Sequence, residues 1–269
     1  MNMGLTPLKL PARLHDFVTF VYLEALCCIF PAVIMLSLAL SKYIDLPIPR
    51  YDFMLIVCLI MQAVMVLSKL ETLDELKVIC LFHVFGLALE LWKVHHGSWA
   101  YPEFAYSKIW DVPIYSGFMY ASVASYICQA WRRFGLRFSE YPHWTANLFA
   151  ILLYLNFFTN HYIEDQRWGL AVALVVMMWN TRVHFNINQR DYQMPLTLSF
   201  LLIGLFIWLA ENISTFYGAW QYPNQTEIWQ RVHYSKISSW SLLVILSFVL
   251  IAKLKGIKSL SRASIQKAS

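Results

Sequence analysis

Charged residues are scarce in this 269-residue sequence, in which Asp, Glu, Lys and Arg together make up 14%. Ordinary soluble domains carry about 25% charged residues, whereas hydrophobic residues reach 59% here. This composition excludes a soluble globular chain. The net charge of +5 comes mostly from the tail after Lys253, and basic residues beside an apolar segment suit a membrane surface. We therefore expect the membrane lipid bilayer, and no nucleic acid, as a partner.

Sequence signatures of several chemistries are also missing. The five cysteines all fall inside apolar segments, which disfavours a disulfide framework. No Walker loop, Gly-x-Gly-x-x-Gly or Gly-x-Ser-x-Gly motif occurs, so the usual nucleotide-binding and serine-hydrolase signals are absent. Apart from the pair His95–His96, the histidines are scattered, whereas a metal site needs clustered ligands. We expect neither a metal nor a cofactor.

Long apolar runs are what the sequence does contain. A transmembrane helix needs about 20 mostly apolar residues, and residues 17–40 meet that length with Glu24 as the only charge. No small-residue cleavage site follows this run, which predicts a permanent helix rather than a signal peptide. Seven further spans are predicted, at residues 53–67, 77–92, 112–131, 144–161, 168–179, 195–211 and 238–253. For the short sixth span, a re-entrant or tilted element is the alternative.

The distribution of positive charge predicts the orientation of these spans. With eight spans, 14 of the 21 lysine and arginine residues lie on the side that holds both termini. Cytoplasmic loops carry the excess of Lys and Arg, so both termini are expected in the cytoplasm. Tryptophan and tyrosine gather at the span ends, as interfacial anchors do. The expected protein is an all-α, multi-pass protein of the cell membrane with about eight transmembrane helices.

An internal repeat is the most informative feature of the sequence. Residues 90–102 read ELWKVHHGSWAYP and residues 211–223 read ENISTFYGAWQYP, and both obey Glu-x6-Gly-x-Trp-x-Tyr-Pro at an offset of 121 residues. The same offset lays the first four spans over the last four. Because four is an even number, both units would share one orientation, as parallel repeats do. We predict a first four-helix repeat at 1–137, a second at 138–254 and a basic cytoplasmic tail at 255–269.

The repeated motif supplies the candidate site. Its Gly, Trp, Tyr and Pro residues are also explained by a purely structural turn at the membrane surface. A carboxylate at a membrane-embedded helix end is costly unless it is paired with another group, hydrated or functional. Glu90 and Glu211 are therefore the candidate catalytic residues, together with His83, which lies two turns before Glu90 on the same helical face. Aromatic and histidine residues near the same span ends are candidates for substrate binding: Trp92, His95, His96, Trp99, Tyr101, Tyr217, Trp220, Tyr222, His161 and His233. A lone histidine in a helix bundle is more often a packing residue.

Two resemblances rest on these residues. The runs HVFGLALELWKVHHGSWAYP and VPIYSGFMYASVASYICQAW resemble the bacterial membrane family called domain of unknown function 817, over nearly the full chain. This resemblance implies the bacterial inner membrane as location and no particular activity. More distantly, an acidic residue followed by Val-x-x-Gly-x-Trp-x-aromatic and a later proline resembles the membrane lycopene cyclases and carotenoid hydratases. Those enzymes protonate an isoprenoid double bond and guide the carbocation. Their Pro-x-Glu-Glu pair does not occur here, and the likeness implies a shared fold more than a shared reaction.

Three functions are compatible with these patterns. The first is a membrane-embedded enzyme that does acid–base chemistry on a lipophilic, isoprenoid-like small molecule, with Glu90 and Glu211 dividing the roles of acid and base. The second is a small proton-coupled transporter, because parallel repeats with carboxylates at their interface also describe such carriers. The third is a non-catalytic membrane scaffold. Transport sites favour the midplane of the bilayer, whereas both glutamates lie near one predicted interface, which favours the enzyme.

Overall fold

A computed structural model describes residues 11–266 of the chain. Residues 1–10 and 267–269, with Lys9 and Lys267 of the predicted charge asymmetry, lie outside the described residues. The described chain is mostly helical, and its helices are α1 (Ala12–Cys27), α2 (Ile29–Leu40), α3 (Arg50–Leu67), α4 (Leu73–His95), α5 (Ser116–Phe134), α6 (His143–Thr159), α7 (Arg167–Met177), α8 (Leu196–Phe216), the 3-10 turn η1 (Pro223–Gln225) and α9 (Lys236–Gln266). The strands are β1 (Lys108–Ile109), β2 (Val112–Pro113), β3 (Arg137–Ser139), β4 (Arg182–Ile187) and β5 (Arg190–Pro195).

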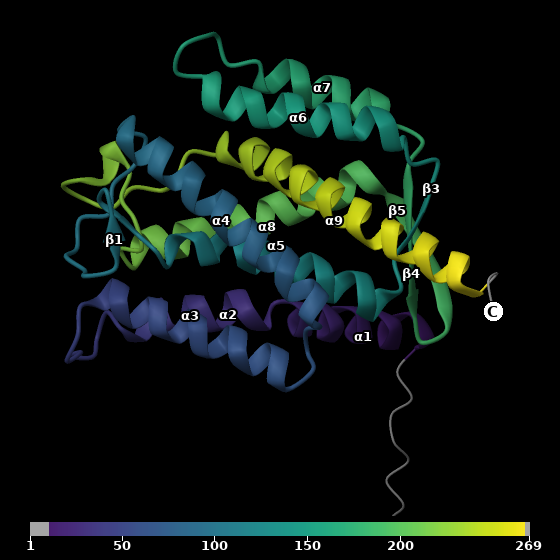
Figure 1. The fold of residues 1–269 in the computed structure, drawn as a ribbon, viewed down its shortest axis with the longest axis horizontal. Helices are drawn as coiled ribbons and strands as arrows, with labels where there is room; N and C mark the ends of the chain where they lie inside the picture. Colours follow the sequence, from purple (N-terminus) through teal and green to yellow (C-terminus); the bar gives the residue numbers. More distant parts are fainter. Residues whose placement is uncertain (1–10, 267–269) are drawn as a thin grey trace, which may run out of the picture.

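The helices lie side by side along the long axis of the molecule, and the chain runs back and forth between two ends (Figure 1). One end holds the start of α1, the end of α9 and a three-stranded antiparallel sheet in the order β3-β4-β5. The opposite end holds the β1–β2 pair and the turns that follow α4 and α8. The start of α1 and the end of α9 are therefore on the same end of the helix bundle.

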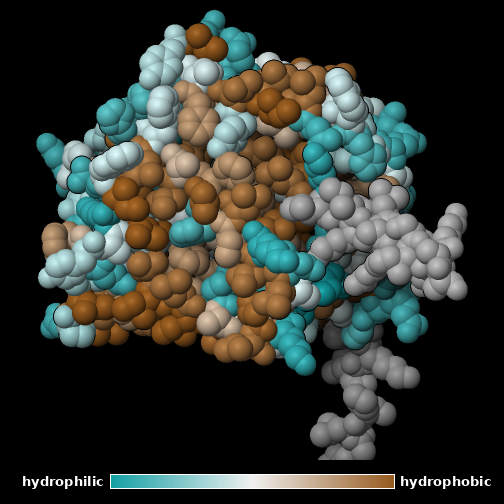
Figure 2. Space-filling model, in the orientation of Figure 1, coloured by the Kyte–Doolittle hydropathy of each residue, from teal (hydrophilic) through white to brown (hydrophobic). Residues whose placement is uncertain are grey.

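Several helices fit a lipid bilayer. Four helices are long and apolar enough to cross it, namely α3, α4, α8 and the Lys236–Lys253 part of α9, and the bent pair of α1 and α2 would make a fifth. Hydrophobic side chains cover the middle of the molecular face in Figure 2, whereas hydrophilic ones gather toward the edges. Large apolar residues that would be buried in a soluble protein are exposed. These features are those of a membrane protein.

The first predicted span is wrong in one respect, because residues 17–40 do not form one helix. Helix α1 ends at Cys27, α2 begins at Ile29, and the two axes differ by 66°. Pro31 lies in the first turn of α2, where its missing N–H costs nothing, but its ring would clash with the carbonyl of Cys27 in a continuous helix. The proline therefore explains why the helix breaks at this position.

The expectation of an all-α chain also needs a correction. The segment between α7 and α8 forms the β4–β5 hairpin, in which Ile187 pairs with Arg190. The two residues of its turn, Asn188 and Gln189, have φ values of 51° and 65°, and two positive φ values are typical of the type I′ turn that joins twisted strands. Similarly, the predicted span at 112–131 begins only at Ser116, because Val112–Pro113 is strand β2.

Small residues bring the helices of two pairs close together. An added Cβ at Gly86 of α4 would lie 2.4 Å from Cγ of Tyr120 on α5. In the other pair, a Cβ at Gly204 of α8 would lie 2.2 Å from Oγ of Ser241 on α9. Glycine lets two helix backbones approach where a larger residue would separate them. The pairs α4–α5 and α8–α9 are thus joined in the same way.

The turns after α4 and α8 contact each other directly. Ala100 and Gln221 exchange both backbone hydrogen bonds, N–H to carbonyl, each 2.9 Å long. The hydroxyl of Tyr115 donates to the carbonyl of Ala219 at 2.7 Å. Arg50, at the start of α3, donates to Glu103 at 2.7 Å and to the backbone carbonyl of Tyr217. These bonds fix the two turns against one another at one end of the bundle.

Candidate functional site

Glu90 is enclosed near the end of α4 and is 3% exposed. Its Oε2 accepts hydrogen bonds from Nε1 of Trp99 at 2.7 Å and from the hydroxyl of Tyr101 at 2.8 Å. Its Oε1 accepts from the hydroxyl of Tyr120 at 2.7 Å. Trp99 and Tyr101 come from the turn after α4 and Tyr120 from α5. The close approach of the α4 and α5 backbones at Gly86 brings Tyr120 to the carboxylate.

Glu211 lies near the end of α8 in a similar setting and is 2% exposed. Its Oε1 accepts from the hydroxyl of Tyr222 at 2.6 Å, and its Oε2 accepts from Nε1 of Trp240 at 2.7 Å. Tyr222 is 121 positions after Tyr101, as Glu211 is after Glu90. The tryptophans are not equivalent, because Trp240 comes from α9 and Trp99 from the turn after α4.

An aromatic contact joins the two carboxylates. The ring of Trp99, bound to Glu90, meets the ring of Tyr222, bound to Glu211, with centroids 6.1 Å apart. The ammonium group of Lys236 lies over both rings, 5.5 Å from the centroid of Trp99 and 4.7 Å from that of Tyr222. Glu90 and Glu211, which we call the glutamate pair, thus belong to one network, although neither bonds to the other.

The tyrosines of this network remain protonated donors. Burial, together with the negative charge of Glu90, raises the pKa of Tyr101 well above its ordinary value. Burial and the charge of Glu211 do the same to the pKa of Tyr222. A tyrosine hydroxyl can also accept a hydrogen bond, whereas an indole N–H can only donate. Each carboxyl can therefore be protonated on its Oε1, which faces Tyr120 in Glu90 and Tyr222 in Glu211. The protonated oxygen then donates a hydrogen bond to the tyrosine hydroxyl, and the bond from tryptophan to Oε2 is unchanged.

A second group, which includes predicted site residues, meets where the end of α4 faces the turn after α6. The Lys93 ammonium donates to Oδ1 of Asn160 at 2.8 Å and lies 3.2 Å from Nε2 of His161. His161 stacks on His96, with ring centroids 4.7 Å apart, and the ring of His96 lies tilted against that of Trp92. An ammonium group can only donate, so Nε2 of His161 accepts from Lys93 and carries no proton in this arrangement. We call the group Trp92, Lys93, His96, Asn160, His161 and Tyr162 the Lys93 cluster.

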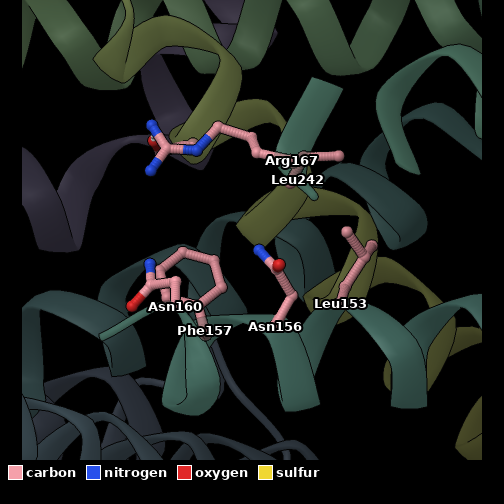
Figure 3. A pocket seen from close by; sticks show the side chains of 7 residues that line it. Leu153, Asn156, Phe157, Asn160, Arg167 and Leu242 are labelled. Carbon is pink, nitrogen blue, oxygen red and sulfur yellow. Dashed lines mark hydrogen bonds between the residues drawn. The ribbon is translucent and has the colours of Figure 1, made fainter. Parts of the chain in front are cut away.

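A small cavity lies beside the Lys93 cluster. It measures about 10 Å³, which is room for about one water molecule. Asn156, Asn160 and Arg167 surround it together with apolar side chains of α6 and α9 (Figure 3). A larger groove of about 550 Å³ runs between α7, α8 and α9 and is mostly apolar. The glutamate pair lines neither of these two spaces.

Other predicted site residues lie apart from the glutamate pair. His83 packs against Phe118, with ring centroids 4.4 Å apart, and its buried Nδ1 has no hydrogen-bond partner among the described residues. His233 binds Ser235, and Tyr217 packs on Phe216 and Tyr43. Trp220 is an exception, because it is part of the hydrophobic core and also hydrogen-bonds Tyr222, the partner of Glu211. His95 is exposed and touches the cluster only through the ring of His96.

Six residues of these two groups lie outside the predicted site: Tyr120, Trp240, Lys236, Lys93, Asn160 and Tyr162. Tyr120 and Trp240 lie in the interior of helices whose sequence gives no local sign of a distant glutamate. The sequence does contain a sign that the two lysines matter. Lys93 lies in the last turn of α4 and Lys236 begins α9, and ionisable residues in apolar helices are rare and often functional.

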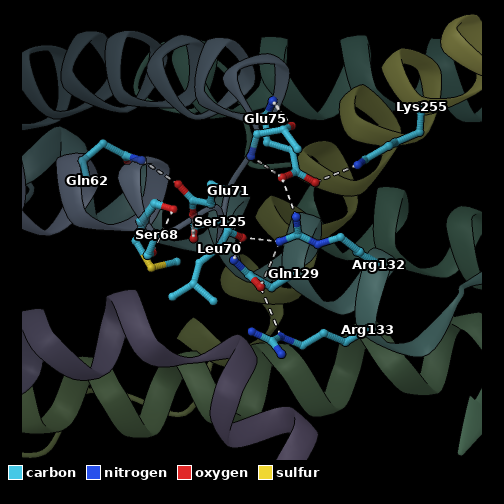
Figure 4. Close-up of polar contacts among 12 residues, drawn as sticks. Gln62, Ser68, Leu70, Glu71, Glu75, Ser125, Gln129, Arg132, Arg133 and Lys255 are labelled. Atoms are coloured by element: carbon cyan, nitrogen blue, oxygen red, sulfur yellow. Dashed lines mark hydrogen bonds and ion pairs between the residues drawn. The ribbon is translucent and has the colours of Figure 1, made fainter.

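A further polar cluster lies at the opposite end of the bundle (Figure 4). Glu75 is buried, accepts from Lys255 at 2.9 Å and lies 3.5 Å from Nη1 of Arg132. Glu71, also buried, accepts from Gln62 at 2.6 Å and from Ser125. Each carboxylate is satisfied by these partners, so the cluster ties α3, α4, α5 and α9 together. Within residues 11–266 no group of three or more His, Cys, Asp or Glu residues could hold a metal ion.

Comparison with known proteins agrees with the first resemblance. The family described as "Protein of unknown function (DUF817)" matches residues 16–248, which confirms that prediction. The uncharacterized protein YoaT of Bacillus subtilis (strain 168) is 56% identical over 250 residues, covering 92% of this chain and 95% of the relative. No solved structure matches.

Proposed function

Because the chain belongs to the family of unknown function DUF817, whose name assigns no activity, we propose a function from the glutamate pair itself. The protein is a membrane-embedded enzyme that carries out acid–base chemistry on a lipophilic, isoprenoid-like substrate. The observation that carries this proposal is the pair of buried carboxylates, each held by one tryptophan and by tyrosine, and joined through Trp99 and Tyr222.

The proposal includes eight membrane spans arranged as two parallel four-helix units, 1–137 and 138–254, with both termini in the cytoplasm. Three findings support the duplication. An offset of 121 residues lays α4 over α8 and α5 over most of α9. Both pairs pack through glycine. Ala100 and Gln221, also 121 residues apart, exchange reciprocal hydrogen bonds, as two residues do when a twofold axis passes between them.

The proposed chemistry is a proton transfer in two halves. One glutamic acid donates its proton to a double-bond carbon of the substrate, which leaves a carbocation on the neighbouring carbon. The other glutamate then removes a proton from an adjacent carbon, and the double bond forms in a new position. The ring faces of Trp99 and Tyr222 already stabilise the positive charge of Lys236, and they could do the same for the carbocation once the lysine moves aside.

The test is a comparison of lipid extracts from cells that lack the protein and cells that express the wild type, Glu90→Gln or Glu211→Gln. Mass spectrometry should find an isoprenoid lipid that depends on the wild type and is lost in both variants. The matched control is Glu227→Gln, which removes an exposed carboxyl from the turn after α8. Identical extracts from all strains, or a full product yield in both site variants, would remove the basis for this function.

A further inference from the structure

Lys93 is a buried lysine, and no carboxylate among the described residues forms an ion pair with it. The residue is 4% exposed, yet the partners of its ammonium group among the described residues are the uncharged side chains of Asn160 and His161 and the ring of Phe157. No carboxylate in residues 11–266 lies within 4 Å of this ammonium group. Buried charges are ordinarily paired with an opposite charge, because desolvation is otherwise costly. The surroundings of Lys93 thus lack a negative partner.

Hydrogen-bond donors are in excess around this lysine. The ammonium has three N–H donors, of which the structure pairs two. Nε1 of Trp92 is buried with no partner among the described residues. His96 uses Nδ1 to donate to the carbonyl of Trp92 at 2.8 Å, which leaves its Nε2 facing the hydroxyl of Tyr162. One N–H of the Lys93 ammonium and Nε1 of Trp92 are thus the two donors without an acceptor among the described residues, and unused donors near a positive charge are suited to an anion with several acceptor oxygens.

The nearby carboxylate does not supply that anion. Asp165 is engaged by Arg167 at 2.7 Å and by Asn156 at 3.0 Å. The positive charges of Lys236 and Arg167 also act on Lys93, where the negative charge of Asp165 opposes them. Three cations therefore converge on the end of α4, where only one of them has a carboxylate partner within 4 Å among the described residues.

The position of the cluster in the bilayer indicates where an anion would come from. Helix α4 is long and apolar enough to span the membrane, and Lys93 lies in its last turn, at the depth of lipid headgroups. Two exposed side chains at this surface are largely apolar, Tyr162 at 69% and Ile163 at 59%, and the exposed Glu164 and Asp165 follow them in the turn. The side chains of Tyr162 and Ile163 would contact the upper part of an acyl chain.

We propose that the Lys93 cluster binds the phosphate group of an anionic phospholipid. The phosphate oxygens accept from the Lys93 ammonium and from His161, which lies at the surface above it, while the acyl chains run along α6 past Tyr162 and Ile163. This site lies on α4 and α6 and does not depend on the proton transfer assigned to the glutamate pair.

The experiment uses the full chain purified in a neutral detergent. Thermal unfolding is followed with added phosphatidylglycerol, phosphatidylcholine or inorganic phosphate, and native mass spectrometry counts the lipids retained. The variants are Lys93→Gln and His161→Ala, and the matched control is Arg231→Gln, which removes an exposed positive charge at the same end of the bundle. We expect phosphatidylglycerol to raise the melting temperature of the wild type and of the control. Its affinity should fall about tenfold in Lys93→Gln.

Several results would overturn the proposal. Equal stabilisation by phosphatidylcholine would mean that no anion is recognised. Stabilisation by inorganic phosphate alone, to the same extent as by the lipid, would contradict a lipid source. If Lys93→Gln does not fold, His161→Ala decides the matter, because this residue is exposed and its loss leaves the helix packing intact. Full retention of phosphatidylglycerol by His161→Ala would then contradict the site.

Discussion

Glu90 and Glu211 each accept hydrogen bonds from two kinds of side chain, a tryptophan and at least one tyrosine. Trp99 and Trp240 can only donate, whereas the tyrosine hydroxyls can also accept. A glutamine at either position can accept from the tryptophan through its oxygen and donate to a tyrosine through its amide nitrogen. The hydrogen bonds therefore survive the loss of the ionisable proton, which allows stability and activity to be measured separately.

We expect Glu90→Gln to melt within a few degrees of the wild type and Glu90→Leu to be destabilised. Leucine leaves the indole of Trp99 and the hydroxyls of Tyr101 and Tyr120 buried without an acceptor, at a cost of about 1–3 kcal/mol for each unpaired group. Thermal unfolding in detergent measures the difference. Equal melting temperatures for the two variants would mean that these hydrogen bonds do not stabilise the fold.

Glycine at position 86 has a measurable role. In Gly86→Ala the new Cβ would overlap the ring of Tyr120, so the helices must separate or Tyr120 must leave Glu90, at a cost of about 1–3 kcal/mol. The control is Gly169→Ala on α7, where the nearest atom is 3.9 Å away and alanine should stabilise the helix by about 0.5–1 kcal/mol. Chemical denaturation of both variants should give opposite signs, and a neutral Gly86→Ala would contradict the tight packing.

At the scale of the elements, apolar length alone located most helices. The predicted spans at 53–67, 144–161 and 168–179 match α3, α6 and α7 closely, because a run of apolar residues bounded by polar ones has few other structures available in a membrane. The break at Cys28 was not predicted, although Pro31 is visible in the sequence. Hydropathy averages over the whole run of residues 17–40, so a single proline hardly changes its value. The helix break that the proline causes therefore does not show in a prediction based on hydropathy.

The β4–β5 hairpin could not be recognised from length either. Its strands are six residues each and lie in a segment that the span prediction treated as a loop. The hairpin is held in place by a distant contact, since Asp16 of α1 accepts from Asn188 at 2.8 Å, Arg190 at 2.7 Å and Tyr192 at 2.6 Å. Such partners are set by tertiary structure, so only the alternating pattern of residues 182–187 could have indicated a strand.

The turn between α6 and α7 gives a prediction of pH dependence. Burial alone would raise the pKa of Asp165, but hydrogen bonds from Asn156 and from Arg167, together with the Arg167 charge, hold it below its ordinary value. A carboxyl with a depressed pKa stabilises the folded state above its unfolded pKa, and this contribution is lost as the pH falls through the folded pKa.

Wild type should therefore be more stable than Asp165→Asn at neutral pH, and the difference should disappear as the pH falls below the ordinary pKa of an aspartate and through the lower pKa of the folded Asp165. Melting temperatures measured across this range check the prediction. Asp45→Asn, which changes an exposed carboxyl, should follow the wild type at every pH. A constant gap between wild type and Asp165→Asn would show that the carboxylate does not supply the stability.

At the scale of the whole molecule, the two ends of the bundle predict the topology. The start of α1 and the end of α9 share one end with the β3-β4-β5 sheet, and the turns around Trp99 and Trp220 share the other. We expect reporter fusions to place the C-terminus and the loop after Arg133 in the cytoplasm and both turns outside. A C-terminus outside the cytoplasm would contradict the eight-span arrangement.

The motif shared by residues 90–102 and 211–223 contains part of the network around the glutamate pair but not all of it. Both glutamates, Trp99, Tyr101 and Tyr222 belong to the motif, and all five lie in one network. The remaining members come from α5 and α9, whose side chains reach the glutamates only after the helices have packed. A motif reports residues that are close along the chain, and the partners contributed by a neighbouring helix are outside its range.

The reciprocal bonds between Ala100 and Gln221 have a consequence for the history of the chain. If the two halves descend from a single shorter protein, the ancestor of Ala100 and Gln221 was one residue, which paired with the same residue of a second subunit. Every substitution at that residue therefore changed both sides of the contact. Fusion into one chain ended that constraint, because each half could then mutate alone. The separate tryptophans that hold Glu90 and Glu211 would be a product of this freedom, which gives each carboxyl surroundings of its own.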